Sequence, residues 1–311
     1  MQAGRADYNE MEENTMTSRL LAGVLPGIVS AVLALQPVEA ADYKIGVLAK
    51  DGAAKAKSTW QATADFLGQK LPGDTFMLVP LGFDEVFPAV EKGDVQFFVV
   101  NSSMFVTARD KYGASAVATM VVSRQGKSSP AFGGVVFTRA NNAAVNTFAD
   151  LKGKSFMAVD AKSFGGWQMA QKALLDAGID PSKDFTRLSF GGTHENVVLA
   201  VQNGDADAGT VRTDTLEGMA AAGDIGLADF KVLNAQAHAD FPFVVSTPLY
   251  PEWPIARTSG TDPAAAAKVA DALVAMKAED KAAKDAKVAG WSKPLDYGPV
   301  EALQRTLGDL K

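Results

Sequence analysis

Cysteine is absent from this 311-residue sequence, and its absence excludes several kinds of site. No disulfide, thiolate nucleophile or cysteine-ligated metal can form. A bacterial lipid anchor is excluded as well, because that modification requires a cysteine at the cleavage site. Histidine is also scarce. The chain has two, which argues against a histidine-based zinc site and against most catalytic triads.

Other signs of catalysis are missing too. No serine stands in a Gly-x-Ser-x-Gly nucleophile elbow, and no pair of carboxylates stands out as a general acid and base. We therefore predict a protein without cofactor, metal or catalytic activity. An exported enzyme remains the less favoured alternative.

Positive charge is in deficit. The net charge of −6 argues against nucleic acid or an anionic membrane surface as a partner. A small anion remains compatible with this charge, because binding one requires a few local hydrogen-bond donors and not a positive field over the whole protein.

A hydrophobic run long enough to cross a membrane is also lacking. The run from Leu20 to Leu35 follows Arg19, is broken by glycine and proline, and is shorter than the roughly 20 residues of a membrane span. Val38-Glu39-Ala40 supplies a small-residue cleavage site, so residues 1–40 are predicted to be a signal peptide, with an uncleaved anchor as the alternative. The stretch before Met16 is acidic, so Met16 is the expected true start. The mature protein is expected to be periplasmic and not lipid-anchored.

The mature chain alternates short apolar runs with longer helical patterns. Strand, helix, strand, helix, strand is typical of parallel strands covered by helices. Two such series follow one another along the chain. The expected strands are 44–49, 75–81 and 95–100, then 155–160, 185–190 and 206–211, and the expected helices lie near 59–71, 83–92, 166–177 and 194–203.

The two series also match in register. "AVEKGDVQFFVV" (89–100) and "AVQNGDADAGTV" (200–211) share Ala-Val-x-x-Gly-Asp and a final Val, at an offset of 111 residues. We predict an α/β protein with two similar lobes joined by two crossovers; a single sheet is the alternative. The first lobe would comprise 41–134 plus 246–311 and the second 135–245. Ligands would bind in the cleft between the lobes, where the carboxyl ends of the strands meet.

One candidate site is the turn in "VDAKSFGGWQMA" (159–170), where a strand gives way to a helix. Ser163, Phe164, Gly165 and Gly166 form this turn. Unpaired backbone amides at a helix start attract anions, and the serine adds a hydroxyl. The spacing fits neither GxGxxG nor a P-loop, which disfavours a nucleotide. An anion site and an ordinary serine-capped turn remain open.

A second turn of the same kind occurs in "FGGTHENVVLAV" (190–201). Thr193 is expected to cap a helix, and His194 would lie in its first turn, where the ring can donate a hydrogen bond to an anion. A solvated histidine near a helix start is the alternative. The offset of 111 places Phe83 at the position equivalent to His194, and both are expected at the edge of the cleft.

The same offset pairs Asn101-Ser102 with Arg212-Thr213. Both dipeptides follow the third strand of their series, so all four residues are expected to line the cleft. Arg212 is the best candidate for a fixed counter-charge to an oxyanion, although Asp214 is an alternative partner for it.

Aromatic side chains are expected to wall the same cleft. The candidates are Trp60, Tyr250 and Trp253.

Several stretches together resemble one family of proteins. "TFADLKGKSFMAVDAKSFGGWQ" (147–168), "FGGTHENVVLAVQNGDADAG" (190–209) and "FPFVVSTPLYPEWP" (241–254) resemble solute-binding proteins for phosphate, phosphite and phosphonate. The words "GGVVFTR", "GTVRTDTLE" and "STPLYPEWP" look most like the branch that forms the periplasmic input domains of sensor histidine kinases. The resemblance implies a type II periplasmic binding protein fold, acting as a monomer. Its ligand would be a small anion and its membrane partner an ABC permease or a sensor kinase.

The resemblance also assigns ligand contacts. The family's Ser-Thr-Ser-Gly-Tyr turn corresponds to residues 163–167, where Ser163 and Gly166 are retained. The family's helix-start histidine corresponds to His194, and its Gly-Pro after the third strand is Asn101-Ser102 here. Two hydroxyl donors are therefore lost and Phe164 is gained, so the pocket is expected to suit a different or larger oxyanion, or an organic acid.

Overall fold

The first three strands of the described chain are parallel and form one side of the first sheet. The computed structural model describes residues 40–124 and 126–310, so the predicted signal peptide lies outside the described residues except for Ala40. The central strand of the three is buried along its last four residues, as its apolar sequence requires. The strands are β1 (Asp42–Leu48), β2 (Thr75–Leu81) and β3 (Phe97–Val99), with β1 between the other two.

Antiparallel strands complete this first sheet. They come from two separate parts of the chain, and the sheet order is β14-β4-β13-β3-β1-β2, with β5 attached to β4 as a hairpin. The sequence patterns did not predict β4, although it is the longest strand described. The added strands are β4 (Ser115–Arg124), β5 (Lys127–Ser129), β13 (Pro254–Arg257) and β14 (Val288–Ser292).

Helices cover this sheet through regular apolar faces. In the first helix Ala56, Trp60, Ala64 and Leu67 are buried, a spacing of three to four residues that puts them on one side. The helices are α1 (Ala53–Lys70), α2 (Val86–Lys92), α3 (Ser102–Tyr112), α8 (Pro263–Val274), α9 (Lys281–Ala286) and α10 (Gly298–Leu307).

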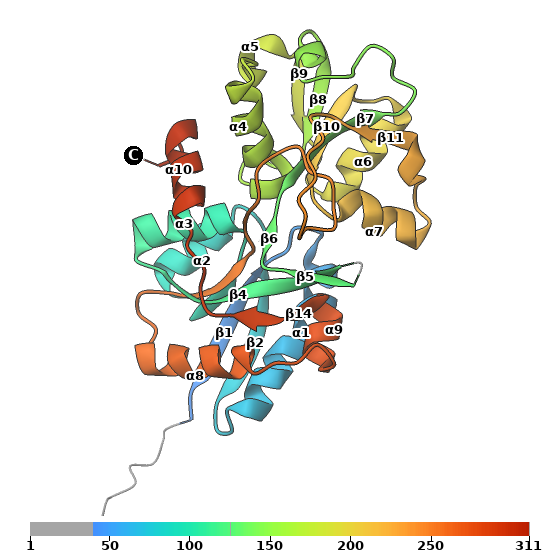
Figure 1. Ribbon diagram of the computed structural model, residues 1–311. Coiled ribbons are helices and arrows are strands. Elements are labelled where there is room, and N and C mark those ends of the chain that lie inside the picture. Colours follow the sequence, from blue (N-terminus) through green and yellow to red (C-terminus); the bar gives the residue numbers. More distant parts are fainter. Residues whose placement is uncertain (1–39, 125, 311) are drawn as a thin grey trace, which may run out of the picture. The chain divides into compact units, whose positions relative to one another are not determined.

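The second sheet repeats this plan on a smaller scale. Its order is β11-β7-β10-β8-β9, with β8 parallel to both β9 and β10, and β7 antiparallel to β10 (Figure 1). Its strands are β7 (Gly134–Arg139), β8 (Ser155–Ala158), β9 (Arg187–Phe190), β10 (Ala208–Arg212) and β11 (Phe230–Val232). Its helical elements are η1 (Ala149–Leu151), η2 (Phe164–Gln168), α4 (Met169–Asp176), α5 (Pro181–Asp184), α6 (His194–Asn203), α7 (Thr215–Ala222) and η3 (Leu227–Asp229).

The internal repeat has a structural basis. Adding 111 residues to β1, β2 and β3 places each on β8, β9 and β10, and each triplet has the same order with one antiparallel strand beside its third member. The predicted strands and helices of both series are present, and the two-lobed α/β prediction is confirmed. We keep the boundaries 41–134 plus 246–311 and 135–245 as our proposal for the two lobes.

The two crossovers run side by side. β6 (Ala131–Phe132) on the outward path pairs with β12 (Tyr250–Pro251) on the return path, in a two-stranded ribbon separate from both sheets. The final helix contacts elements of both halves of the structure. α10 contacts α3, a helix that covers the first sheet, and also α4, a helix that covers the second. Gln168 of η2 donates a hydrogen bond to Asp309, just beyond α10 (3.0 Å).

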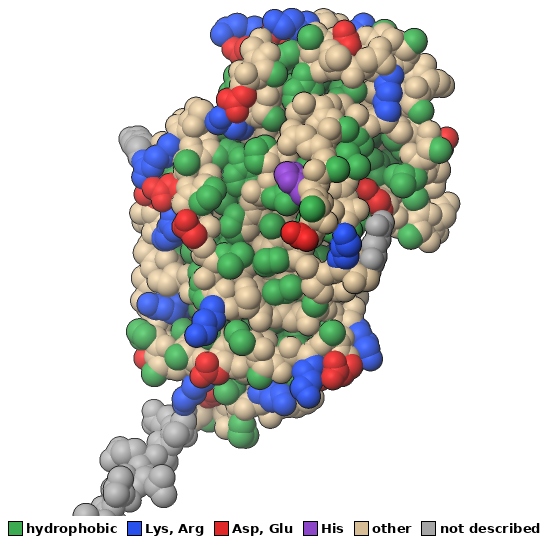
Figure 2. Space-filling view, viewed as in Figure 1, with side chains coloured by type: hydrophobic (Ala, Val, Ile, Leu, Met, Phe, Trp, Pro, Cys, Tyr) green, Lys and Arg blue, Asp and Glu red, His purple; other side chains and the backbone are tan. Residues whose placement is uncertain are grey.

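Among residues 40–124 and 126–310, no helix is both long and apolar enough to cross a membrane. On the face shown in Figure 2, most positive and negative side chains lie near one another around the periphery, while a histidine and a few charged groups lie among apolar and uncharged atoms near the middle.

The buried face of α1 provides a test of the fold. Leu67 is 0% exposed in the core under the first sheet, so Leu67→Ala is expected to lower the free energy of unfolding by about 2–5 kcal/mol. Leu199→Ala on α6 is the matched control, because Leu199 is 40% exposed and its loss should change stability by only about 0.5 kcal/mol. Urea denaturation measures both. Equal effects of the two variants would contradict the helix orientation.

Candidate functional site

Residues from both sheets and both crossovers line one cavity. The cavity holds about 230 Å³ of space outside protein atoms, a figure that includes space open to solvent. Equivalent positions of the repeat meet here: Phe83 and His194 form one pair, and Asn101 and Arg212 the other. The lining residues are Leu48, Lys50, Phe83, Asn101, Phe132, Ser163, Phe164, Gly165, His194, Arg212 and Trp253.

The Ser163 turn starts a helix whose first turn is irregular. Ser163 is the N-cap, and its hydroxyl oxygen accepts a hydrogen bond from the amide of Gly166 (3.2 Å). The helix begins with a π-type segment, η2, and π-type turns inside helices often mark functional sites. The amides of Phe164 and Gly165 precede the first bond of the helix, so they are available to an anion. The serine hydroxyl proton is free to donate in the same direction.

Gly165 is required by close packing and not by backbone conformation. A Cβ atom at this position would lie 2.8 Å from the ring of Phe132 and 2.9 Å from Cβ of Arg212. Gly166 is similarly restricted, since its Cβ would lie 2.5 Å from the side chain of Val159. Gly166 is therefore a packing residue behind the turn and does not line the cavity.

His194 occupies the start of α6, as the sequence predicts. Thr193 caps this helix by accepting a hydrogen bond from the amide of Asn196 (3.2 Å), and it does not line the cavity. Nδ1 of His194 accepts a hydrogen bond from the backbone amide of Arg212 (3.3 Å), so the ring proton belongs on Nε2. Burial, and then the nearby charges of Lys50 and Arg212, hold the pKa of His194 well below its ordinary value of 6.5. The imidazole is therefore a neutral donor.

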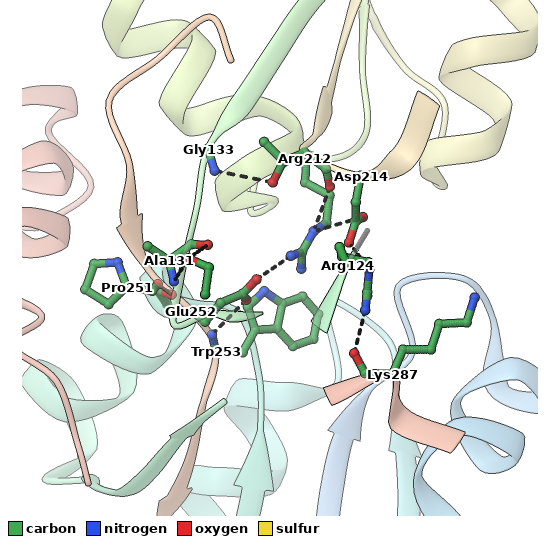
Figure 3. Close-up of polar contacts among 12 residues, drawn as sticks. Arg124, Ala131, Gly133, Arg212, Asp214, Pro251, Glu252, Trp253 and Lys287 are labelled. Atoms are coloured by element: carbon green, nitrogen blue, oxygen red, sulfur yellow. Dashed lines mark hydrogen bonds and ion pairs between the residues drawn. The ribbon is translucent and has the colours of Figure 1, made fainter. Parts of the chain in front are cut away.

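Arg212 is buried and held by several partners. It is 8% exposed, its Nη2 donates to Oε1 of Glu252 (2.5 Å), and its guanidinium lies 4.6 Å from the centre of the Phe132 ring (Figure 3). Burial alone would lower its pKa, but the carboxylates of Glu252 and Asp214 outweigh that effect and raise it. The side chain is therefore a permanently charged group at the wall of the cavity. The predicted competition from Asp214 is present, with its Oδ1 3.9 Å from Nε.

Asn101 links the two sheets. Its Oδ1 caps α3 by accepting from the amide of Met104 (3.0 Å), and its Nδ2 donates to the carbonyl of Lys162 in the second sheet's turn (3.1 Å). Lys50 lies at the corresponding turn of the first sheet and pairs with Asp51.

Three predicted residues lie away from this cavity for identifiable reasons. Trp60 is 7% exposed and packs against Trp291 with ring centroids 6.2 Å apart, because it belongs to the apolar face of α1. Ser102 donates its hydroxyl to the carbonyl of Pro251 (2.6 Å), which ties α3 to the return crossover. The Thr213 hydroxyl faces the amide of Gly133 (3.5 Å). Trp60, Ser102 and Thr213, like Gly166 and Thr193, therefore do not line this cavity.

Sequence reasoning missed Lys50 and Phe132. The repeat contained a signal for Lys50, because the turn 49–52 lies 111 residues before the turn 160–163 that was singled out. Phe132 had no such signal. It reaches the cavity from β6, and its ring meets Phe164 at 6.0 Å, while Phe164 also meets the ring of Tyr250 at 5.1 Å.

The cavity offers hydrogen-bond donors and almost no free acceptors. None of its lining side chains is a carboxylate. The side-chain acceptors are occupied by protein donors: Asn101 Oδ1 by Met104 and Ser103, Ser163 Oγ by Gly166, and His194 Nδ1 by Arg212. Within the part of the chain that the structure describes, no cluster of three or more histidines and carboxylates is suited to a metal ion. The arrangement therefore suits an oxyanion without a proton of its own.

Comparisons with known proteins agree with this geometry. Residues 45–297 match the family model described as "ABC transporter, phosphonate, periplasmic substrate-binding protein". The chain is 35% identical over 267 residues to the tetrathionate sensor histidine kinase TtrS of Salmonella typhimurium strain LT2. That match covers 86% of this chain but only 44% of the relative, so the chain spans less than half of that protein's length.

Solved structures show the same fold at low sequence identity. One is PhnD1 from Prochlorococcus marinus (MIT 9301) in complex with methylphosphonate, with a TM-score of 0.71 and 15% identity over 86% of this chain and 99% of that chain. Another is a binding-protein component of a phosphonate ABC transporter from Pseudomonas aeruginosa, with a TM-score of 0.69 and 17% identity over 86% of each chain.

The tight packing at Gly165 yields a prediction. Gly165→Ala is expected to lower the free energy of unfolding by about 1–3 kcal/mol, because the new methyl group displaces Phe132 or Arg212. Gly218→Ala in α7 is the matched control. No atom lies within 4 Å of its added Cβ, so it should stabilise the helix by about 0.5–1 kcal/mol. Chemical denaturation measures both, and a neutral Gly165→Ala would contradict the close approach.

The buried imidazole predicts a pH dependence. The pKa of His194 is lowered in the folded protein from its ordinary 6.5, so below pH 6.5 the unfolded chain binds a proton that the folded chain does not. The free energy of unfolding should therefore fall as the pH drops through 6.5, by about 1.4 kcal/mol per pH unit for one proton. His194→Asn should reduce this slope in urea titrations at several pH values. An unchanged slope in the variant would show that the histidine is not buried in its neutral form.

Proposed function

The chain belongs to the family of periplasmic substrate-binding proteins of phosphonate ABC transporters, and from this premise we propose that it is an exported receptor for a small oxyanion. Its two lobes close over the ligand, and the closed form is presented to a membrane partner. The protein carries out no chemistry of its own. Residues 1–40 direct export and are removed, the absence of cysteine leaves no lipid anchor, and the receptor acts as a monomer.

The observation that carries the proposal is the excess of hydrogen-bond donors over free acceptors among the side chains that line the cavity. Ser163, His194 and the amides of the η2 turn can donate to oxygen, and Lys50 and Arg212 add positive charge. A ligand that carries its own hydroxyl needs an acceptor, and an unpaired buried donor is costly. The preferred ligand is therefore fully ionised and accepts hydrogen bonds only.

This requirement separates two classes of oxyanion. Phosphate, phosphite and phosphonates carry a P–OH group in part of their population near neutral pH, because their last ionisation lies close to that pH. Sulfate and organic sulfonates carry no such proton. We therefore propose a sulfur oxyanion as the ligand class, in place of the phosphonate that the family's description suggests.

Tetrathionate is the specific candidate within this class. The relative at 35% identity is named for sensing it, although this chain spans 44% of that protein. Tetrathionate has two sulfonate ends and a central pair of sulfur atoms. Phe164 replaces a hydroxyl residue of the family turn and forms an aromatic wall with Phe132 and Tyr250. Polarizable sulfur packs favourably against aromatic rings, so this wall suits the central sulfurs.

The membrane partner is the remaining choice. The family's description favours an ABC permease, and the similarity to a sensor histidine kinase favours a signalling partner. We propose a permease as the primary partner and a sensor kinase as the second candidate. Both would recognise the closed form, so the ligand site is the same in either case.

Direct binding measurements test the ligand class. Sodium tetrathionate at about 100 times its dissociation constant should stabilise the protein by about 2.7 kcal/mol in thermal denaturation. Methylphosphonate and phosphate at the same concentration should give a smaller shift. Calorimetry should show that Ser163→Ala weakens tetrathionate binding about tenfold, while Ser58→Ala on the exposed side of α1 leaves it unchanged.

Two outcomes would contradict this proposal at different levels. Stronger stabilisation by methylphosphonate than by tetrathionate would overturn the sulfur oxyanion while keeping the receptor. No stabilisation by any oxyanion would overturn the anion site itself.

A further inference from the structure

Four charged side chains of alternating sign form a chain beside the cavity. Nε of Arg124 contacts Oδ2 of Asp214 (2.5 Å), Oδ1 of Asp214 lies 3.9 Å from Nε of Arg212, and Nη2 of Arg212 contacts Oε1 of Glu252 (2.5 Å). Figure 3 shows these groups pointing toward one another, with Arg212 in the middle. The side chains are largely buried, with exposed fractions of 27% for Arg124, 16% for Asp214, 10% for Arg212 and 1% for Glu252.

The four charged residues come from both sheets and from the return crossover. Arg124 ends β4 of the first sheet, and Glu252 lies on the return crossover between β12 and β13. Arg212 and Asp214 lie at the end of β10 in the second sheet. Arg124–Asp214 is therefore an ion pair between the two lobes.

Asp214 adopts an unusual backbone conformation for this contact. Its φ of 70° is left-handed, a region that non-glycine residues occupy at a cost. It precedes α7, but its side chain makes no capping hydrogen bond there, although aspartate is among the best N-cap residues. The carboxylate is directed to the two arginines instead. A strained residue that gives up its usual local bond indicates a constraint from function.

Glu252 and Asp214 limit which N–H groups of Arg212 can bind a ligand. Nη2 is held by Glu252, and Nε faces the carbonyl of Thr213 and the carboxylate of Asp214. Among the described residues, no protein acceptor contacts Nη1. The two N–H groups of Nη1 can therefore donate to an anion in the cavity.

We propose that Asp214 is a positioning residue that couples lobe closure to ligand binding, by bonding Arg124 of the first lobe and orienting Arg212 at the site. This inference rests on the proposed function for its ligand, whereas the Arg124–Asp214 contact is observed in the structure. The Arg124–Asp214 pair stabilises the closed form, and the closed form in turn retains the ligand. Release of the ligand requires this pair to break.

Asp214→Gly separates this role from a structural one. Glycine adopts a φ of 70° without strain, so the variant keeps the local backbone conformation and loses the carboxylate. Sodium tetrathionate should nevertheless dissociate about tenfold faster in stopped-flow measurements, with little change in the association rate. Asp214→Asn should behave in the same way, because asparagine also tolerates this conformation.

Variants of Arg124 complete the test. Arg124→Gln should give the same faster dissociation. Arg124→Lys should dissociate at a rate between those of the parent and Arg124→Gln, because the positive charge is kept. The double variant Arg124→Gln with Asp214→Asn should release the ligand no faster than Asp214→Asn alone, since the asparagine already removes the ion pair with Arg124. Equal dissociation rates in Asp214→Gly and the parent, or additive effects in the double variant, would overturn the proposal.

Closure can also be measured without any ligand. The chain has no cysteine, so Lys92→Cys on α2 and Lys183→Cys on α5 provide two unique, exposed labelling sites. Electron–electron resonance distances between spin labels should shift toward an open form in Arg124→Gln and Asp214→Gly relative to the parent. Unchanged distances would overturn the closure contact. A shift in these distances together with no binding of tetrathionate to the parent would support the contact and overturn only the proposed ligand.

Discussion

The buried ion pair between Arg212 and Glu252 is the interaction on which the site depends. A guanidinium taken out of water needs a partner, and removing one member of such a pair commonly costs about 3–5 kcal/mol. Arg212 comes from the second sheet and Glu252 from the return crossover, so their contact fixes where that crossover passes. Glu252 is fixed in turn: its carbonyl accepts a hydrogen bond from the buried hydroxyl of Tyr297 (2.8 Å), and its Oε2 accepts one from the amide of Trp253 (3.2 Å). A charged group can therefore lie at the cavity wall without being free to move.

The internal repeat explains why the functional groups converge. Each set of three parallel strands ends in turns and helix starts at the same edge, and closing one set against the other brings equivalent positions together. Phe83 and His194 line the cavity from equivalent positions of the repeat, and so do Asn101 and Arg212. Within each pair, however, the residue types differ. The first lobe supplies an aromatic ring and an amide that binds the other lobe's backbone, whereas the second supplies the imidazole and the guanidinium. Equivalent positions of the repeat therefore form the site, but their side chains differ in chemistry.

Much of the fold could be predicted from the sequence, because local periodicity and turn residues carry it. The two parallel triplets, the Ser163 turn and the start of α6 at His194 all follow from short patterns. The errors came from contacts between residues far apart in the chain. Trp60 has the residue type of a ligand wall but the helix position of a core residue, and helix position decided its place. Ser102 directs its hydroxyl to Pro251, 149 residues away, and no local pattern contains that partner. The pairing of Arg212 with Glu252 could not be predicted from the sequence either, since only the folded crossover brings the two residues together.

The central claim is that a proton-free sulfur oxyanion binds the donor-lined cavity, and sulfur anomalous diffraction from crystals grown with sodium tetrathionate tests it most directly. The protein has no cysteine, and none of the described residues that line the cavity is a methionine, so a sulfur signal there comes from the ligand. The account predicts anomalous peaks between the two lobes, with sulfonate oxygens about 3 Å from Ser163 Oγ, His194 Nε2 and Arg212 Nη1. Tetrathionate bound elsewhere with this cavity unoccupied, or bound here without contact to Ser163, His194 or Arg212, would contradict it.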